Sequence, residues 1–206
     1  MSRPPHIGLT GNIGSGKSTV AKLLVAKGAA LIDSDALARE ATGDPAILQR
    51  IAEALGADLI QNGELDRAKT AERVFGDQAA LKTLNGIIHP WVREQSELRA
   101  QALADGSHPP PLILFDIPLL YENGLETTLD AVIVVDAPIA SRIARVRQRS
   151  GLSAAQVRAR DAAQLALSEK VSRADFVISN DANLQDLEAQ VDDLWESLTR
   201  FAETRE

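Results

Sequence analysis

The segment Gly11–Ser18 constrains the fold of this chain more than any other part of its sequence. It reads GNIGSGKS, which matches the pattern G-x-x-x-x-G-K-[ST] in full. A short apolar run, His6–Thr10, precedes it, and a helical pattern, Lys17–Lys27, follows. Glycines let backbone N–H groups curl around an anion, and the helix presents the positive end of its dipole. The order of strand, loop and helix therefore predicts a phosphate-binding loop at the start of an α/β fold.

The residue types in this loop indicate what it binds. Lys17 supplies a positive charge for the β- and γ-phosphates of a nucleotide, and the Ser18 hydroxyl is suited to bind Mg²⁺. The alternative is a glycine-rich turn that matches by accident, and the strand and helix around the loop argue against it. The motif alone does not distinguish a kinase from a GTPase, an ATPase motor or a nucleotide sensor.

Four further apolar runs predict the rest of a sheet. They are short, rich in Ile, Leu and Val, and mostly continuous rather than alternating, as in parallel strands that are buried on both faces. Helical patterns lie between them, and a last one covers about Leu184–Ala202. We expect a five-stranded parallel sheet in an α/β layered fold. The four runs are Ala29–Ile32, Leu112–Phe115, Ala131–Val135 and Phe176–Ser179.

The spacing of these runs is uneven. Between Ile32 and Leu112 we find no convincing strand, although a βαβ crossover needs only about a dozen residues. We therefore predict a helical insertion over about residues 35–110, a smaller helical segment over about 138–173, and a core from about 1–34, 111–137 and 174–206. The insertion is expected to contain helices at Asp35–Ala41, Pro45–Leu55, Arg67–Phe75, Gln78–Ile87 and Trp91–Ala104.

Acidic residues follow two of the predicted strands. Asp33 and Asp35 lie after the second strand, at the edge where ligands bind in open α/β sheets. In an extended chain both carboxylates could face one side, where one could accept a proton and the other could orient Mg²⁺ or the substrate. Alternatively, Ser34 or Asp35 could cap the next helix. Asp116 ends the third strand, where a second Mg²⁺-directing group is expected, or it is an ordinary strand-end aspartate.

Composition excludes several classes of protein. There is no cysteine, so disulfides, thiolate metal sites and cysteine nucleophiles are ruled out. The net charge of −7 argues against nucleic-acid binding through bulk electrostatics, although the arginines between positions 142 and 160 form a local basic region. No signal peptide or membrane-spanning run is visible. We expect a cytoplasmic protein that is a monomer or a weak homo-oligomer and has no nucleic-acid or membrane partner.

Four longer motifs then resemble one family. TGNIGSGKST, LIDSDALARE, IIHPWVRE and LFDIPLLYENG, in this order and spacing, are similar to dephospho-CoA kinases. The resemblance continues in NGELDRAKTAERVF, GLSAAQVRARDAAQ, SEK and ADFVISN, so it covers nearly the whole chain. It implies a three-layer P-loop kinase fold in which residues 35–110 bind the substrate and residues 138–173 form a lid. It also implies transfer of phosphate from ATP, with Mg²⁺, to the ribose 3′-hydroxyl of dephospho-CoA.

The resemblance also implies roles for single residues. Asp35 is similar to the presumed general base, with Asp33 beside it, while Lys17 and Arg145 would act on the transferred group. Ser18 and Asp116 would bind Mg²⁺. The dephospho-CoA site would include Asp35, His89, Pro90, Asp116 and Leu119. ATP would be bound by Gly11, Gly14, Ser15, Gly16, Lys17, Ser18, Thr19 and Arg149, with Arg160 as a further lid arginine.

Each of these assignments has an alternative. His89 precedes a proline and could be structural. Arg142, Arg145 and Arg149 recur at intervals of three and four residues, so they share one helix face, and such a face is often merely solvated.

The chain departs from the family pattern at four positions. Asn12 replaces a common glycine, and Tyr121 replaces the usual phenylalanine. Arg142 stands where many members have glutamine, and Asp161 stands where an apolar residue is common. The departures at positions 142 and 161 concern the predicted lid.

Other functions remain as alternatives. Another nucleoside or nucleotide kinase would share the same architecture. A GTP-dependent switch would carry an N-K-x-D segment after a strand, but Ser179–Asn183 reads SNDAN, without a lysine. A non-catalytic nucleotide-binding regulator would not need the additional acids or the arginine cluster.

Overall fold

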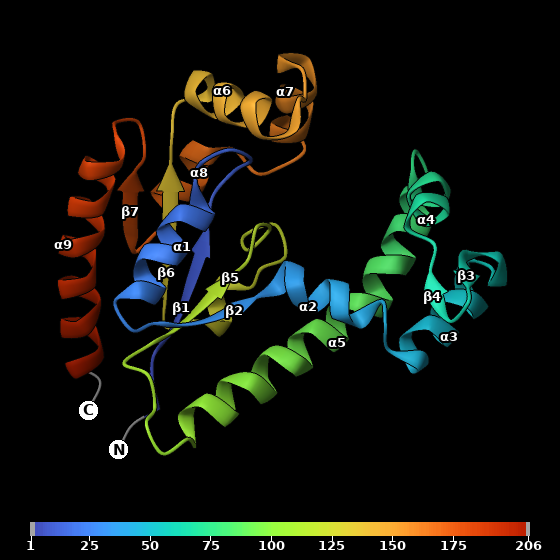
Figure 1. Cartoon of the computed structure of the whole chain (residues 1–206), viewed down its shortest axis with the longest axis horizontal. Coiled ribbons are helices and arrows are strands. Elements are labelled where there is room, and N and C mark those ends of the chain that lie inside the picture. Colours follow the sequence, from blue (N-terminus) through green and yellow to red (C-terminus); the bar gives the residue numbers. More distant parts are fainter. Residues whose placement is uncertain (1–2, 205–206) are drawn as a thin grey trace. The chain divides into compact units, whose positions relative to one another are not determined.

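The computed structural model describes residues 3–204, which form two compact units. The first unit comprises the chain up to Ile32 together with the chain from Leu103 onward. The second unit is Asp33–Ala102, a segment close to the predicted insertion. Figure 1 gives the order of the elements along the chain.

A five-stranded sheet forms the centre of the first unit, as predicted (Figure 1). The strand order is β2-β5-β1-β6-β7, so the first strand lies in the middle. The pairings of β1 with β5, of β1 with β6 and of β6 with β7 are parallel. Each strand begins and ends within one residue of the predicted limits. The strands are β1 (His6–Thr10), β2 (Ala30–Asp33), β5 (Ile113–Asp116), β6 (Ala131–Asp136) and β7 (Phe176–Ser179).

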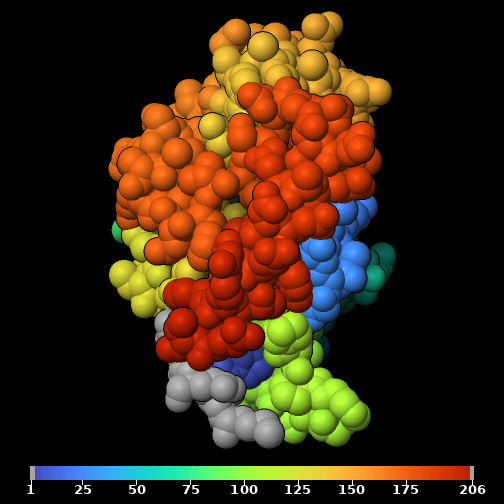
Figure 2. Space-filling model, turned by 90° about the vertical axis from the view of Figure 1, so that its left-hand side faces the viewer, coloured from blue at the N-terminus to red at the C-terminus, as the bar shows by residue number. Residues whose placement is uncertain are grey.

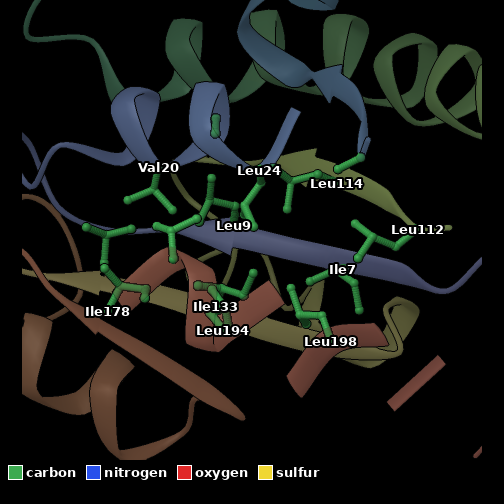
Figure 3. Packing of buried hydrophobic residues seen from close by; sticks show 14 of the residues in the cluster. Ile7, Leu9, Val20, Leu24, Leu112, Leu114, Ile133, Ile178, Leu194 and Leu198 are labelled. Atoms are coloured by element: carbon green, nitrogen blue, oxygen red, sulfur yellow. The ribbon is translucent and has the colours of Figure 1, made fainter. Parts of the chain in front are cut away.

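Side chains of β6 point alternately to two helical layers. Ala131, Ile133 and Val135 pack in the cluster that includes residues of α1 (Lys17–Ala26) and α9 (Leu184–Glu203), shown in Figure 3. Figure 2 shows α9, in red, on the surface of this unit. On the other face, Val132 and Val134 pack with residues of the segment 117–129 and of α8 (Leu167–Ser172). The unit therefore has the predicted three layers.

Three helices occupy the predicted lid segment. α6 (Ile139–Ser150) follows β6, and α7 (Ala154–Ala162) lies next to it beyond the carboxyl ends of the strands (Figure 1). Gly151 ends α6 in the left-handed conformation, which favours glycine. Ser153 begins α7 with a capping box. These signals set the sharp turn between the two helices, and α8 then leads back to the sheet.

The second unit is mostly helical. Its core includes Ile47, Ile51, Leu59, Leu84 and Ile87. Its elements are α2 (Ser34–Ala41), α3 (Pro45–Leu55), the 3₁₀ helix η1 (Ala57–Leu59), β3 (Ile60–Gln61), β4 (Glu64–Leu65), α4 (Arg67–Val74) and α5 (Gln78–Ala104). Among the described residues, even the longest helices lack an apolar stretch that could cross a membrane.

Two expectations for this unit are wrong. Helices were expected at Gln78–Ile87 and Trp91–Ala104, but α5 is one helix of 27 residues that contains Pro90. A proline inside a helix costs about 3 kcal/mol, and apolar residues on both sides of it pack on the same core, which offsets that cost. The absence of a strand was also wrong, because β3 and β4 form a hairpin. Its turn is Asn62-Gly63, with both residues at positive φ, the sequence typical of a tight hairpin.

Candidate active site

The glycine-rich loop between β1 and α1 takes a backbone shape that requires glycine at two positions. Gly14 has φ +78° and Gly16, the N-cap of α1, has φ +95°. A Cβ atom on Gly14 would lie 2.6 Å from the carbonyl oxygen of Arg142, and one on Gly16 would lie 2.0 Å from Nδ2 of Asn180. Larger residues are therefore excluded both by conformation and by the close approach of neighbouring segments.

Side chains from α6 and from the end of β7 fix the orientation of this loop. The carbonyl oxygen of Ser15 accepts hydrogen bonds from Asn180 Nδ2 at 2.7 Å and from Arg145 Nη1 at 3.3 Å. In a trans peptide the C=O of one residue and the N–H of the next point in opposite directions. Holding the Ser15 carbonyl outward therefore turns the Gly16 N–H toward the inside of the loop, which suits an anion.

Lys17 and Asp116 form an ion pair at the same edge of the sheet. Lys17 is the first residue of α1, and Asp116 is the last residue of β5, whose register pairs it with Leu9 of β1. Their side chains are 17% and 10% exposed. The parallel topology thus brings a cation and a carboxylate together beside the loop, as expected for strands whose carboxyl ends meet.

The comparisons with known proteins agree with this geometry. The family model for dephospho-CoA kinase (CoaE) matches residues 6–186. The chain belongs to the dephospho-CoA kinase family. The dephospho-CoA kinase of Deinococcus radiodurans is 47% identical over 192 residues, which cover 93% of this chain and 91% of the relative.

Solved structures are similar over almost the whole chain. The crystal structure of TT1252 from Thermus thermophilus is 40% identical with a TM-score of 0.79, and the match covers 96% of this chain and 99% of that one. The dephospho-CoA kinase of Campylobacter jejuni is 26% identical with a TM-score of 0.71, and the match covers 95% and 97%. The predicted P-loop kinase fold is thereby confirmed.

Asp33 and Asp35 do not share one extended segment, because α2 begins between them, so that premise of the sequence analysis is wrong. Asp33 ends β2 and is also the N-cap of α2, where its carboxylate accepts a hydrogen bond from the Ala36 N–H at 2.9 Å. The alternative interpretation assigned helix capping to Ser34 or Asp35, but Asp33 performs it. Asp35 lies in the exposed first turn of α2. The two carboxylates therefore differ: that of Asp33 is engaged in a hydrogen bond to the helix backbone, and that of Asp35 is exposed to solvent.

Ser18 and Asp116 lie at the loop and at the neighbouring strand end in the first unit. Ser18 is exposed in the first turn of α1, and Asp116 is buried and paired with Lys17. Among residues 3–204, no group of three or more His, Asp or Glu side chains could hold a metal ion by itself. One hydroxyl and one carboxylate fit Mg²⁺, which typically retains water and substrate oxygens as its other ligands.

The expected substrate residues lie in both units. His89 and Pro90 are in α5, with His89 half-buried and Pro90 exposed. Burial and the nearby Arg93 guanidinium lower the pKa of His89, which favours the neutral imidazole. Leu119 follows β5 and is 42% exposed, so its side chain is accessible from solvent.

The arginines that the sequence analysis names in the predicted lid have different environments. Arg142 is buried, and Arg145 donates hydrogen bonds to the loop carbonyls and, at 2.7 Å, to the carbonyl oxygen of Asn180. Arg149 on α6 and Arg160 on α7 are exposed. The interpretation as a solvated face is therefore wrong for Arg142, and Arg145 supports the loop backbone directly.

Sequence reasoning missed Asn180 as a site residue. The sequence places it in the family motif ADFVISN and in a segment without a guanine-binding lysine, but neither observation assigns it a role at the loop. Its side chain donates to Ser15 from the end of β7 and blocks any side chain at position 16. A polar residue directly after a parallel strand was the available signal, since such residues meet at the ligand-binding edge. Asp161 and Gln164 accept hydrogen bonds from the loop residues Asn12 and Ile13. Sequence reasoning also missed these two contacts, because nothing in the spacing of the residues indicates them.

Proposed function

We propose that this chain transfers the γ-phosphoryl group of ATP to the ribose 3′-hydroxyl of dephospho-CoA and releases coenzyme A and ADP. The observation that carries the proposal is the loop Gly11–Ser18 with its outward-held carbonyls and the adjacent Lys17–Asp116 pair, in a chain of the dephospho-CoA kinase family. ATP and dephospho-CoA are the substrates in this proposal.

The loop is proposed to bind the phosphates of ATP through backbone N–H groups, from Gly11, Gly14, Ser15, Gly16, Lys17, Ser18 and Thr19. Two features support this: the inward-turned Gly16 N–H and the N-terminus of α1 directly after it. Lys17 would move its charge from Asp116 toward the transferred phosphoryl group. A positive group placed where negative charge accumulates lowers the barrier to transfer.

Asp35 is proposed as the general base that accepts the proton of the attacking hydroxyl. Its exposure in the first turn of α2 leaves the carboxylate accessible to a substrate. Asp33 is proposed to act beside it by fixing the start of α2 through its capping hydrogen bond. His89, Pro90 and Leu119 are proposed to contact dephospho-CoA.

Mg²⁺ is the proposed cofactor, held by Ser18 and Asp116. When bound, it neutralises phosphate charge during transfer. Arg145 and the exposed Arg149 are proposed to contact the phosphates of ATP, and Arg160 is a further candidate. Cytoplasmic location, a monomeric or weakly oligomeric state and the absence of nucleic-acid and membrane partners stay predictions from the sequence.

The test is an assay of ADP release by the purified chain with ATP, Mg²⁺ and dephospho-CoA. We expect turnover, a product heavier by one phosphate, and a phosphorus NMR signal that places the new phosphate on the ribose 3′-oxygen. Adenosine, guanosine and thymidine serve as competing acceptors, and Lys17→Ala is the inactive control. Transfer to a nucleoside but not to dephospho-CoA would indicate a different kinase. ADP binding without transfer to any acceptor would indicate a regulator.

A further inference from the structure

Asn12, Arg142 and Asp161 form one hydrogen-bonded network between the loop and the lid helices. Arg142 Nη1 on α6 lies 2.5 Å from Asp161 Oδ1 on α7, and its Nη2 lies 3.3 Å from Oδ2. Asn12 Nδ2 in the loop donates to the same Asp161 Oδ1 at 2.8 Å. All three residues lie in the first unit. These are three of the four positions at which the sequence departs from its family pattern.

Because two members of this network are buried, the loss of a hydrogen bond within it is costly. Asn12 is 3% exposed and Arg142 is 5% exposed, so neither can exchange its partners for bulk water. Arg142 Nε also donates to the carbonyl oxygen of Ala137 at 3.0 Å, which fixes the plane of the guanidinium. A buried guanidinium without a carboxylate would be strongly unfavourable. Although burial raises the pKa of Asp161, the hydrogen bonds from Arg142 and Asn12 outweigh it and lower this pKa, so the carboxylate stays charged.

The orientation of the Asn12 amide is also determined. Its Nδ2 donates both to Asp161 and, at 3.2 Å, to the carbonyl oxygen of Leu165. Exchanging the amide oxygen and nitrogen would place the oxygen against two acceptors. The oxygen has no hydrogen-bond partner among residues 3–204. Asn12 is therefore held to the lid through its donor group alone.

The next loop residue is held by the same segment. The Ile13 N–H donates to Gln164 Oε1 at 2.9 Å, and the Ser15 N–H donates to the carbonyl oxygen of Asn12 at 3.0 Å. A displacement of Asn12 would therefore pass through its carbonyl to Ser15. Ser15 precedes Gly16, whose N–H the loop turns inward.

We propose that Asp161 is a positioning residue for nucleotide binding, which acts by holding Asn12 and thereby the first half of the phosphate-binding loop. A carboxylate is needed because it must accept from Asn12 and Arg142 at once. An asparagine at position 161 has one acceptor and a donor group that would face another donor. The proposal rests on the proposed function to the extent that the nucleotide is bound by this loop.

The test measures ADP affinity by calorimetry, without dephospho-CoA or turnover, for a double-mutant cycle of Asn12→Ala and Asp161→Asn. Asn12→Ala removes the connection but leaves the Arg142–Asp161 ion pair, so the fold is retained. We expect each single variant to weaken ADP binding about tenfold, the loss typical of one charge-assisted hydrogen bond. The double variant is expected to bind ADP no more weakly than the single variant with the lower affinity, because both substitutions remove the same interaction. Asp193→Asn, the same substitution at an exposed position of α9, is the matched control.

Two further measurements separate positioning from general stability. The KM for ATP should rise in Asn12→Ala while kcat at saturating ATP stays within about twofold. Adding Arg142→Gln to Asp161→Asn should restore stability in urea, because the buried charge is then removed.

The proposal is overturned if either single variant binds ADP as the unaltered chain does, if the two losses of affinity add, or if the unaltered chain does not bind ADP. Loss of dephospho-CoA turnover with this ADP pattern intact would overturn the proposed function alone.

Discussion

Lys170 is fully buried, and its Nζ lies 2.8 Å from a carboxylate oxygen of Glu122. Glu122 also accepts the Leu165 N–H at 2.8 Å, so one carboxylate connects the segment after β5 both to α8 and to the turn that precedes it. Replacing Glu122 by Gln keeps the shape but removes the carboxylate that pairs with the buried ammonium group of Lys170. We expect Glu122→Gln to lower the free energy of unfolding by about 3 kcal/mol, measured by urea denaturation.

Glu169→Gln is the control for this prediction. Glu169 lies on α8 beside Lys170, but it is exposed, and its ion pair with Arg173 is long, at 3.8 Å. Loss of this charge should therefore lower the free energy of unfolding by less than about 1 kcal/mol. Combining Lys170→Met with Glu122→Gln should recover most of the lost stability, because both charges are then absent. If Glu122→Gln and Glu169→Gln lowered the free energy of unfolding equally, the Lys170–Glu122 pair would contribute no more to stability than an exposed pair.

Gly14→Ala tests the shape of the phosphate-binding loop. The new Cβ would lie 2.6 Å from the backbone of α6 and would force a positive φ on alanine. Such backbone strain costs about 1–3 kcal/mol, so ADP affinity measured by calorimetry should fall by about tenfold or more.

Gly86→Ala is the matched control, since a Cβ there meets no atom within 4 Å inside helix α5. It should raise the free energy of unfolding by about 0.5–1 kcal/mol, because alanine is the better helix former. If Gly14→Ala bound ADP normally, the close approach of α6 would not matter for function.

Much of the fold was predictable because it depends on local signals. The five strands are continuous apolar runs, and the loop Gly11–Ser18 has a fixed spacing of residue types. The break expected at Pro90 failed for a tertiary reason: Ile88 before it and Trp91 after it pack on the same core. A single proline has a known local cost, but the packing that offsets it is not visible in the sequence.

The site was predictable in part for the same reason. Lys17 begins the helix that follows β1 and its loop, and Asp116 ends the parallel strand β5, so their meeting at one sheet edge follows from the topology. Asp161 lies on a lid helix far along the chain from Asn12, and no periodicity indicates that contact. A functional role for Asp33 stays a prediction, and whether Asp33 would cap α2 depended on the residue at which the helix begins.

Asp35→Asn tests the proposed general base. Asparagine retains the shape of the side chain but does not accept the proton, so we expect kcat with dephospho-CoA to fall by about 10²–10⁴-fold. ADP affinity should be unchanged. Asp33→Ala is the comparison, because it should lower the free energy of unfolding by about 1 kcal/mol through loss of the cap. Near-normal turnover of Asp35→Asn would exclude the base assignment.

His89 is expected to make stability depend on pH. Burial, followed by repulsion from Arg93, lowers its pKa in the folded chain below the ordinary value of 6.5. Between the folded and the ordinary pKa, the unfolded chain binds more protons, so the free energy of unfolding falls as the pH drops through that window. Below the folded pKa this contribution levels off. Urea midpoints from about pH 7.5 down to 5 measure the effect.

Two variants assign the pH effect to this residue. His89→Gln removes the titrating group, so the difference in urea midpoint between it and the unaltered chain should shrink as the pH falls. Arg93→Gln removes the smaller cause of the lowered pKa but leaves burial, so it should retain most of the dependence. A His89→Gln variant with the same pH profile as the unaltered chain would assign the dependence to other groups. An Arg93→Gln variant with no dependence would make charge repulsion, rather than burial, the main cause.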